Sequence, residues 1–257
     1  MENDKMKTNR IVAIIQAHMS SSRLPGKVMK DLCGMPALYR MIERLRNCKY
    51  LDEIVVATSH LECDDVLIEA CEKWGVSTFR GSNNDVLARF AGTVKEYPAD
   101  AYVRLTSDCP AIDPYVLEDL IQFFWHNEYL YASMVSETHF PGCWSFEIFT
   151  AELMQENVAN ATEGYEREHV TPYMYTKQPS IGSLPGPFDA SKYQVSVDTP
   201  EDYTVVKSFF EALYPNNPNF TSYDVAKYLD EHPEVYEINA NMPHKHYTCC
   251  SYDNFDE

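Results

Sequence analysis

The segment Ile11–Lys27 reads IVAIIQAHMSSSRLPGK, a continuous apolar run followed at once by a polar loop. The run Ile11–Gln16 has the length and composition of a strand that is buried on both faces. The loop contains three serines, a glycine and two fixed cations, Arg23 and Lys27. A packed core requires none of these residues at that place, so the loop indicates a ligand outside the core.

The alternation of apolar runs and helical spacing continues through the first half of the chain. We predict three further strands and four helices, namely strands Glu53–Thr58, Val76–Phe79 and Ala101–Thr106, and helices Pro36–Cys48, Cys63–Trp74, Asp85–Lys95 and Pro114–Trp125. Continuous apolar strands separated by helices are typical of an α/β fold with a mostly parallel sheet that is covered on both faces. In such sheets ligands bind beyond the carboxyl ends of the strands.

The pattern is looser after residue 126. We predict strands at Leu130–Val135, Trp144–Phe149, Ile181–Leu184 and Tyr193–Val197. We predict helices at 150–160, 165–177, Pro200–Leu213 and Ser222–His232. The chain then divides into a flexible N-terminus (1–9), one domain (10–235, with halves 10–126 and 127–235) and a tail (236–257) without periodicity. His244, His246 and the pair Cys249–Cys250 have metal-ligating side chains, but a frayed end is the favoured interpretation.

Charge and composition exclude several classes of function. The net charge of −18 over 257 residues argues against nucleic acid or an anionic membrane as partner. Residues 1–50 nevertheless hold ten Lys/Arg against four Asp/Glu, and such a basic island suits a small anionic ligand. Four of these cations, Arg40, Arg44, Arg46 and Lys49, are expected on a solvated helix face. Apolar runs are too short for a signal peptide or a membrane span, which predicts a cytoplasmic protein with eight free thiols and no membrane insertion.

The loop after the first strand has the chemistry of a polyphosphate site. Hydroxyls of Ser20, Ser21 and Ser22 donate hydrogen bonds, and Gly26 lets the backbone approach closely. Arg23 supplies a planar fork and Lys27 a point charge. The loop lacks the GxxxxGK[ST] pattern of P-loop NTPases, and a solvated loop with incidental charges is the alternative interpretation.

Two aspartates follow strands and form a candidate metal site. Asp108 comes just after the fourth strand, and Asp198 lies between a predicted strand and a helix that begins at Pro200. Mg²⁺ is commonly held by one or two carboxylates together with phosphate oxygens and water. The alternative for each is a helix cap, the role expected of Asp113 before Pro114 and of either Asp198 or Thr199 before Pro200.

Five motifs, in this order, resemble those of the cytidylyltransferase family: QAHMSSSRLPGKV, GSNNDVLARF, VRLTSDCPAIDP, YEREHVTPY and SVDTPEDY. The most similar group is that of spore-coat polysaccharide biosynthesis (SpsF-like) proteins, which are related to the synthetases of CMP-KDO and CMP-sialic acid. The resemblance runs from about Ile11 to Leu213. It implies a three-layer α/β/α nucleotide-diphospho-sugar transferase fold, Mg²⁺ and a homodimer. The implied reaction transfers CMP from CTP to a sugar or sugar acid, releasing pyrophosphate, in the synthesis of surface polysaccharide or glycan.

The same resemblance implies roles for individual residues. Nucleotide binding falls to Gln16, Ala17, His18, Ser20, Ser22, Arg23, Lys27, Ser82, Asp85, Arg89 and Thr106. Catalysis falls to Lys27, Arg23 and Asp108, with Asp108 and Asp198 as ligands of Mg²⁺. The acceptor is expected near Glu147, Arg167, Glu168 and His169. For Asp85 and Arg89 an exposed i,i+4 pair on one helix is the alternative.

The chain departs from the family pattern at two places. His18 stands where relatives usually have arginine, and a neutral imidazole lacks the bidentate fork, which favours slower catalysis. Cys143 and Ser145 stand at a glycine and an aspartate, and these changes are expected to reshape the acceptor pocket. Two other functions stay open: a relative that binds nucleotide or a partner without turnover, and a glycosyltransferase. Glycosyltransferases of similar fold usually carry Asp-x-Asp after a strand, and TSDCP has one aspartate.

Overall fold

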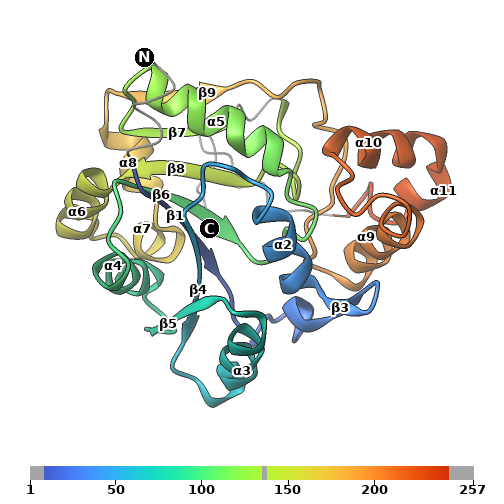
Figure 1. Ribbon diagram of the computed structural model, residues 1–257, viewed down its shortest axis with the longest axis horizontal. Helices are drawn as coiled ribbons and strands as arrows, with labels where there is room; N and C mark the ends of the chain where they lie inside the picture. The colour runs from blue at the N-terminus through green and yellow to red at the C-terminus, as the bar shows by residue number, and fades with distance from the viewer. Residues whose placement is uncertain (1–8, 135–137, 243–257) are drawn as a thin grey trace.

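A seven-stranded sheet forms the centre of the molecule in the computed structural model, which describes residues 9–134 and 138–242 (Figure 1). The strand order is β5-β4-β1-β6-β8-β7-β9, and β8 is the one strand antiparallel to its neighbours β6 and β7. The mostly parallel sheet is therefore confirmed. The strands are β1 (Ile11–Gln16), β4 (Glu53–Ser59), β5 (Ser77–Gly81), β6 (Ala101–Thr106), β7 (Tyr131–Met134), β8 (Phe146–Thr150) and β9 (Ile181–Leu184).

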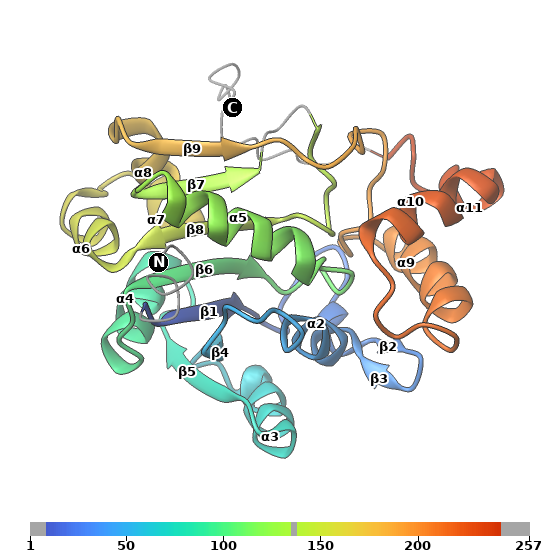
Figure 2. The same cartoon turned by 45° about the horizontal axis from the view of Figure 1, so that its top comes forward.

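Side chains of a strand alternate between the two faces of a sheet, and here apolar side chains lie on both faces. A layer of helices therefore covers each face. Ile15 and Leu105 pack with α2 (Ala37–Leu45), α3 (Asp65–Trp74) and α5 (Pro114–His126). Ile14 and Tyr102 pack with α4 (Val86–Glu96), α6 (Ala151–Asn160) and α8 (Pro172–Lys177) on the opposite face, and α7 (Gly164–His169) contacts α4. Figure 2 shows the sheet between these layers. The predicted α/β/α arrangement is confirmed.

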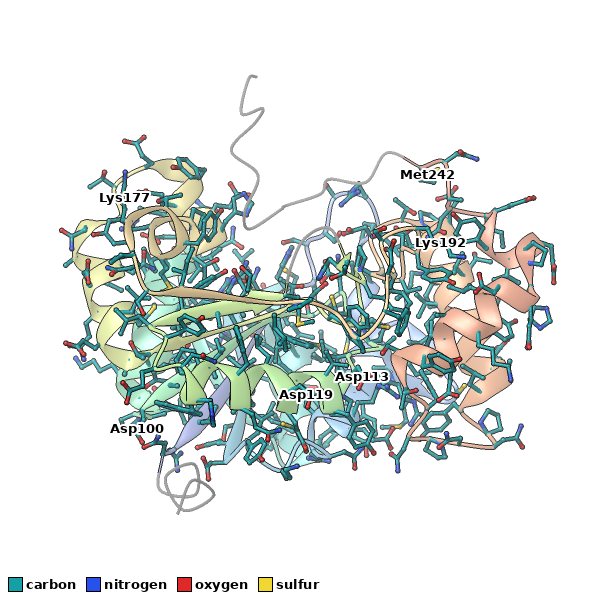
Figure 3. The ribbon with its side chains drawn as sticks, turned by 90° about the horizontal axis from the view of Figure 1, so that it is seen from above. Asp100, Asp113, Asp119, Lys177, Lys192 and Met242 are labelled. Carbon is teal, nitrogen blue, oxygen red and sulfur yellow. The ribbon has the colours of Figure 1, made fainter. Side chains whose placement is uncertain are left out.

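The carboxyl ends of the parallel strands all reach the same edge of the sheet. Figure 2 shows the arrows of β1, β6 and β7 pointing to the right, towards α9, α10 and several shorter elements beyond this edge. In Figure 3, Asp100, just ahead of β6, and Lys192 lie towards opposite ends of the molecule. The elements beyond this edge are β2 (Asp31–Leu32), β3 (Met35–Pro36), the 3-10 helix η1 (Lys27–Met29), α9 (Pro200–Leu213), α10 (Ser222–Glu231) and α11 (Pro233–Tyr236).

Two predicted elements differ from the structure. The helix expected over 165–177 is two helices, because Val170 has φ +71° and Thr171 precedes the proline that begins α8. The segment Tyr193–Val197 is not a strand. Its backbone N–H groups at Val195 and Val197 donate to the Pro141 and Asp108 carbonyls, so it packs on the core without a strand partner.

The prediction of a solvated face for the cations of α2 is wrong for two of the four. Arg40 is 4% exposed and donates to the carbonyls of Leu32 and Cys33. Arg44 is 3% exposed and donates to the carbonyls of two loops beyond the carboxyl edge of the sheet, at Ile112 and Phe220. These guanidinium groups fasten α2 to neighbouring loops, whereas Arg46 and Lys49 are exposed as expected.

Parts of the two predicted chain ends lie outside the described residues, including His244, His246, Cys249 and Cys250. The predicted tail is packed at its start, because Asn239 is 2% exposed and donates to Asp202 Oδ1 at 2.8 Å and to the Gln194 carbonyl at 3.0 Å. The cysteines within residues 9–134 and 138–242 are all free thiols. Across the same ranges, none of the helices has the length and apolar character needed to cross a bilayer.

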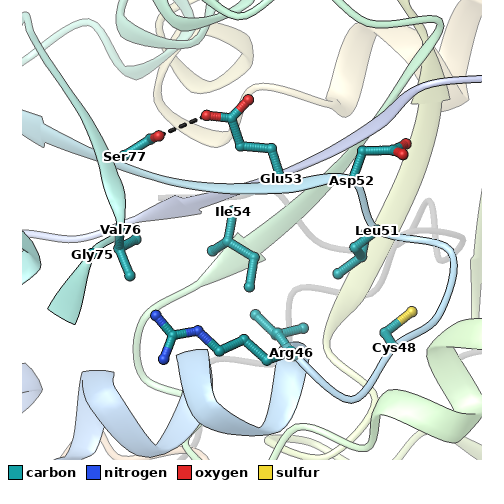
Figure 4. Close-up of a pocket in the computed structure, with 10 residues that line it drawn as sticks. Arg46, Cys48, Leu51, Asp52, Glu53, Ile54, Gly75, Val76 and Ser77 are labelled. Carbon is teal, nitrogen blue, oxygen red and sulfur yellow. Dashed lines mark hydrogen bonds between the residues drawn. The ribbon is translucent and has the colours of Figure 1, made fainter.

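A cavity of about 400 Å³ opens at the amino ends of β4 and β5, away from the predicted site (Figure 4). Its polar side chains already have partners. Arg46 donates to the Trp74 carbonyl at 2.7 Å, and the Glu53 carboxylate accepts from Ser77 at 2.6 Å, as the dashed line shows. Asp52 accepts the Ile11 N–H at 2.7 Å. These contacts give the cavity a structural explanation and leave little for a ligand to bind.

Gly142 is expected to be required for the packing of the segment 193–197. Its φ is +91°, and an added Cβ would lie 2.3 Å from the Ser196 nitrogen. We expect Gly142→Ala to lower the free energy of unfolding by roughly 2–4 kcal/mol, because the strained backbone and the overlap add. Thermal unfolding followed by circular dichroism measures this loss as a fall in Tm. Gly164→Ala is the matched control, since its Cβ meets open space, and an equal Tm for both variants would contradict the argument.

Candidate active site

Four residues predicted for the site come together at the carboxyl edge of the sheet, although they are far apart in the sequence. Lys27 Nζ lies 2.9 Å from Asp198 Oδ1 and 3.3 Å from Asp108 Oδ2. A guanidinium nitrogen of Arg23 lies 3.0 Å from the same Asp198 oxygen. The lysine is 8% exposed, whereas Arg23 is exposed and the two carboxylates are partly buried.

Local backbone features set this geometry. Gly26 has φ +67° and donates its N–H to the Met19 carbonyl at 2.9 Å, which closes the loop ahead of η1 and directs Lys27 inward. The Val197 N–H donates to the Asp108 carbonyl at 2.7 Å, which brings Asp198 beside Asp108. One local and one long-range backbone hydrogen bond therefore build the cluster.

The helix-cap alternatives are now decided. Thr199 is the N-cap of α9 and accepts the N–H of Asp202, whose carboxylate accepts the Thr199 N–H in return. Asp113 caps α5 by accepting from Tyr115 and Val116. Neither Asp108 nor Asp198 is used as a cap, which leaves both carboxylates for the charge cluster.

Burial and charge act against each other in the cluster, and charge prevails. Burial favours the neutral form of Asp108, but the adjacent Lys27 ammonium and hydrogen bonds from Thr106 and Cys109 outweigh it, so the pKa of Asp108 is lowered from its usual 3.8. Burial likewise disfavours charged Lys27, but Asp108 and Asp198 outweigh it and raise the Lys27 pKa above 10.5. Asp108 and Lys27 are therefore both charged at neutral pH.

The donor set fits a Mg²⁺ ion that keeps water or phosphate ligands. Asp108 and Asp198 converge on a single point, where the Lys27 ammonium now lies. Within the described residues, no group of three or more His, Cys, Asp or Glu side chains is arranged to hold a metal. Two carboxylates without further protein ligands are typical of Mg²⁺ sites completed by substrate phosphates.

A buried aspartate that the sequence did not single out anchors the loop. Asp64 is fully buried, and its carboxylate accepts the Met19 N–H at 2.7 Å and the Ser59 hydroxyl at 2.5 Å. It thereby ties the middle of the loop to the carboxyl end of β4. In the sequence Asp64 is one of two adjacent acids before a helix, and its composition and spacing carry no signal for this role.

His18 is half-buried in this loop. Its Nδ1 lies 3.0 Å from the Ser20 hydroxyl. Burial is the largest influence on its pKa and lowers it below 6.5, Asp64 opposes this, and the cations Lys27 and Arg89 lower it further. His18 is therefore neutral at pH 7 in the absence of ligand. Ser20, Ser22 and Arg23 lie exposed in the same loop, while Ala17 is buried.

The segment after β5 places a buried cation beside the loop. Arg89 is 3% exposed and donates to the Ser82 carbonyl at 3.1 Å, its Nε has no hydrogen-bond partner, and no carboxylate of the described residues forms an ion pair with it. Asp85 does not pair with Arg89, so that alternative is wrong. It caps α4 and accepts from Arg167 Nε at 2.9 Å and Nη2 at 2.6 Å.

The sheet face towards α4 and α6 carries a polar group at its carboxyl end. Alternation from the core residues puts Gln16, Thr106 and Glu147 on this face. The Gln16 Oε1 atom is buried without a partner among the described residues, and Thr106 is half-buried. Glu147 is 6% exposed and fully engaged by protein donors. Of the remaining predicted residues, Glu168 is exposed on α7 and His169 is half-buried at its end.

Comparison with known proteins finds a matching family model and similar proteins over most of the chain. Residues 12–257 match a family model described as cytidylyltransferase. A cytidylyltransferase structure from Leptospira borgpetersenii is 33% identical, with 93% of this chain and 100% of that chain covered and a TM-score of 0.84. The spore coat polysaccharide biosynthesis protein SpsF of Bacillus subtilis is 32% identical over 88% of this chain and 97% of its own.

A more distant structure shows the fold. It is a CMP:2-keto-3-deoxy-manno-octonic acid synthetase complexed with CTP, 20% identical, with a TM-score of 0.62 over 79% of this chain and 99% of that chain. Its likeness, with the sheet order and the two helix layers, confirms the nucleotide-diphospho-sugar transferase fold.

Proposed function

The chain belongs to the cytidylyltransferase family, and we propose that it transfers CMP from CTP to a hydroxyl of a sugar or sugar acid, releasing pyrophosphate. The observation that carries this proposal is the position of Lys27 between Asp108 and Asp198, with Arg23 alongside, at the carboxyl edge of the sheet. The name of the SpsF relative supports a place in polysaccharide synthesis, and the CTP-bound structure supports CTP as donor.

The cluster suits nucleotidyl transfer because this chemistry depends mainly on positioning and charge neutralisation. The serine hydroxyls, backbone N–H groups and His18 of the loop would hold the triphosphate. Asp108 and Asp198 would hold Mg²⁺, which when bound neutralises charge at the α-phosphate. Lys27 and Arg23 would then turn from the carboxylates to the departing pyrophosphate.

The nucleoside would lie against the polar sheet face. Within the part of the chain that the structure describes, neither the Nε of the buried Arg89 guanidinium nor the buried Gln16 oxygen has a hydrogen-bond partner. A buried oxygen without a hydrogen bond is stabilised when a ligand donates one to it. The exocyclic amino group of cytosine can donate such a hydrogen bond to Gln16. This supports CTP over UTP, whose base presents an oxygen there.

Release of pyrophosphate tests the proposed function. Purified protein is incubated with Mg²⁺ and each of CTP, UTP, ATP and GTP, alone and with a panel of sugars and sugar acids. Release that requires CTP, Mg²⁺ and an acceptor together is expected. CTP binding without release would favour a relative that has lost turnover, and transfer from a finished nucleotide sugar would favour a glycosyltransferase. The proposal extends to a cytoplasmic homodimer, which sedimentation of the protein and fractionation of the source cells would check.

His18→Arg is expected to raise the turnover number about tenfold or more at pH 8 and to flatten the pH profile between pH 6 and 8. A bound triphosphate favours protonated His18, so wild-type activity falls as pH rises and the imidazolium is lost. Arginine keeps its charge and adds a bidentate fork. His126→Arg, which adds the same charge at an exposed position of α5, is the control. An unchanged rate and pH profile for His18→Arg would rule out this role for the histidine.

A further inference from the structure

The two proposed metal ligands are bridged by a cation of the protein itself. Lys27 Nζ lies 2.9 Å from Asp198 Oδ1 and 3.3 Å from Asp108 Oδ2. Mg²⁺ binds carboxylate oxygens at about 2.0–2.1 Å, so an ion held by these two oxygens would lie at the position of the ammonium or directly beside it. Two cations so close together repel strongly in a partly buried site. The Lys27 ammonium and a divalent cation therefore compete for the same pair of carboxylates.

The two cations of the cluster differ in how easily they can leave it. The Lys27 side chain is largely buried, whereas that of Arg23, which also pairs with Asp198, is 42% exposed. No third carboxylate of the described residues pairs with Lys27. A buried ammonium without a charged partner is strongly destabilised. Arg23 can therefore exchange its carboxylate for water, but Lys27 needs another anion before it can leave.

The backbone of Lys27 is fixed, so a movement of the ammonium is a movement of the side chain. The Lys27 N–H donates to the Leu24 carbonyl at 3.2 Å, and the preceding Gly26 N–H donates to the Met19 carbonyl at 2.9 Å. The four-carbon stem of a lysine is flexible and lets the ammonium turn while the backbone stays in place. A triphosphate held by this loop, as proposed above, would offer the ammonium new anionic partners.

Contacts other than Lys27 keep the two carboxylates in place. The second oxygen of Asp108, Oδ1, accepts from the Cys109 thiol at 3.4 Å. The backbone of Asp198 is held as well, because its N–H donates to Asp202 Oδ2 at 3.1 Å. The pair therefore stays arranged for a cation when the ammonium turns away.

We infer, on the basis of the proposed function, that Lys27 holds the metal position until CTP binds, so that the carboxylate pair accepts a divalent cation only together with the triphosphate. The triphosphate draws the ammonium away and also supplies oxygen ligands to the ion. CTP and the metal therefore each raise the affinity of the protein for the other. In the protein without CTP, Lys27 and Arg23 neutralise the two carboxylates, which would otherwise repel the anionic triphosphate.

Binding of Mn²⁺, measured as loss of the EPR signal of the free ion, tests this inference without turnover. Without nucleotide, we expect Lys27→Met to bind Mn²⁺ at least about tenfold more tightly than the wild type, because the competing cation is gone. Lys30→Met should bind as the wild type does, since the Lys30 ammonium lies over the Tyr203 ring. Saturating α,β-methylene-CTP should then tighten Mn²⁺ binding by a larger factor in the wild type than in Lys27→Met. Equal Mn²⁺ affinities of wild type and Lys27→Met without nucleotide would overturn the inference.

A second comparison keeps the test valid if Lys27→Met does not fold. Without nucleotide, the wild type and Asp108→Asn should bind Mn²⁺ equally weakly, and with α,β-methylene-CTP the wild type should bind it more tightly. A nucleotide-free Mn²⁺ site in the wild type that Asp108→Asn removes would overturn the inference. That result leaves the proposed transfer of CMP intact, because the transfer is tested by pyrophosphate release. The expected Mn²⁺ binding without any pyrophosphate release would support the inference against the proposed transfer.

Discussion

Replacing Asp108 by asparagine is expected to lower kcat by roughly 10³-fold or more and to abolish the dependence of the residual rate on Mg²⁺. The amide has the shape of the carboxylate but lacks its charge, so one of the two proposed ligands of the ion is lost. Lys27 keeps Asp198 at 2.9 Å, so no buried charge is left without a partner. The fold should therefore persist, with a change in unfolding free energy of about 1 kcal/mol or less.

Steady-state pyrophosphate release over a Mg²⁺ titration, together with thermal unfolding, measures both parts of this prediction. Asp119→Asn is the matched control, because Asp119 is exposed on α5 (Figure 3) and its loss of charge leaves the site unchanged. Full activity of Asp108→Asn, or an equal loss in Asp119→Asn, would remove Asp108 from the active site.

Lys27→Met is expected to lower kcat by roughly 10²–10³-fold, about 3–4 kcal/mol of transition-state stabilisation, because the ammonium that neutralises the departing pyrophosphate is lost. It should also change the pH profile. Without Lys27, only the hydrogen bonds from Thr106 and Cys109 still oppose the effect of burial, so the Asp108 pKa rises from its lowered value. Residual activity, which needs the ionised carboxylate, then begins to fall at a higher pH than in the wild type.

Rates of both proteins between about pH 3 and pH 8 check this shift. Lys30→Met is the control, since Lys30 follows in the same segment but lies over the Tyr203 ring and outside the cluster. An acid limb at the same pH in wild type and Lys27→Met would mean that Lys27 does not set the ionisation of Asp108, and the electrostatic account of the cluster would be wrong.

Local pattern predicted most of the fold. The first four strands and their helices follow from continuous apolar runs and helical spacing, and their boundaries in the structure move by a few residues. The prediction of a strand at Tyr193–Val197 was wrong. Alternating apolar residues indicate a buried extended segment, but they do not show whether a neighbouring strand is available for pairing. The prediction that Arg40 and Arg44 are solvated was wrong for a related reason. Their partners are loop carbonyls, whose positions depend on the complete fold.

The candidate site was predicted in part by the rule that ligands bind beyond strand ends. The rule brought Lys27 and Asp108 to the same edge, but the approach of Asp198 depends on the hydrogen bond between the Val197 N–H and the Asp108 carbonyl. Asp85 and Arg167 are 82 residues apart, so no local pattern connects them. The role of Asp64 was missed because the sequence does not distinguish an aspartate that is buried and hydrogen-bonded to a loop from one that is exposed on a helix.

The departures at Cys143 and Ser145 are also clearer in the structure. Cys143 is fully buried, and the adjacent Trp144 packs among Phe140 and Phe188. Ser145 accepts the Gly142 N–H at 3.0 Å, which supports the strained turn at that glycine. These contacts give residues 143–145 a role in packing beside the site, and their effect on the acceptor stays a prediction.

The fate of the phosphates of CTP distinguishes nucleotidyl transfer from simple hydrolysis. CTP carrying ³²P at the α-position or at the γ-position is incubated with Mg²⁺, protein and the preferred acceptor, and the products are separated. The α-label is expected in the acceptor product and the γ-label in pyrophosphate, in equal amounts. Inorganic phosphate carrying the γ-label, or CMP that never joins an acceptor, would contradict nucleotidyl transfer by this protein.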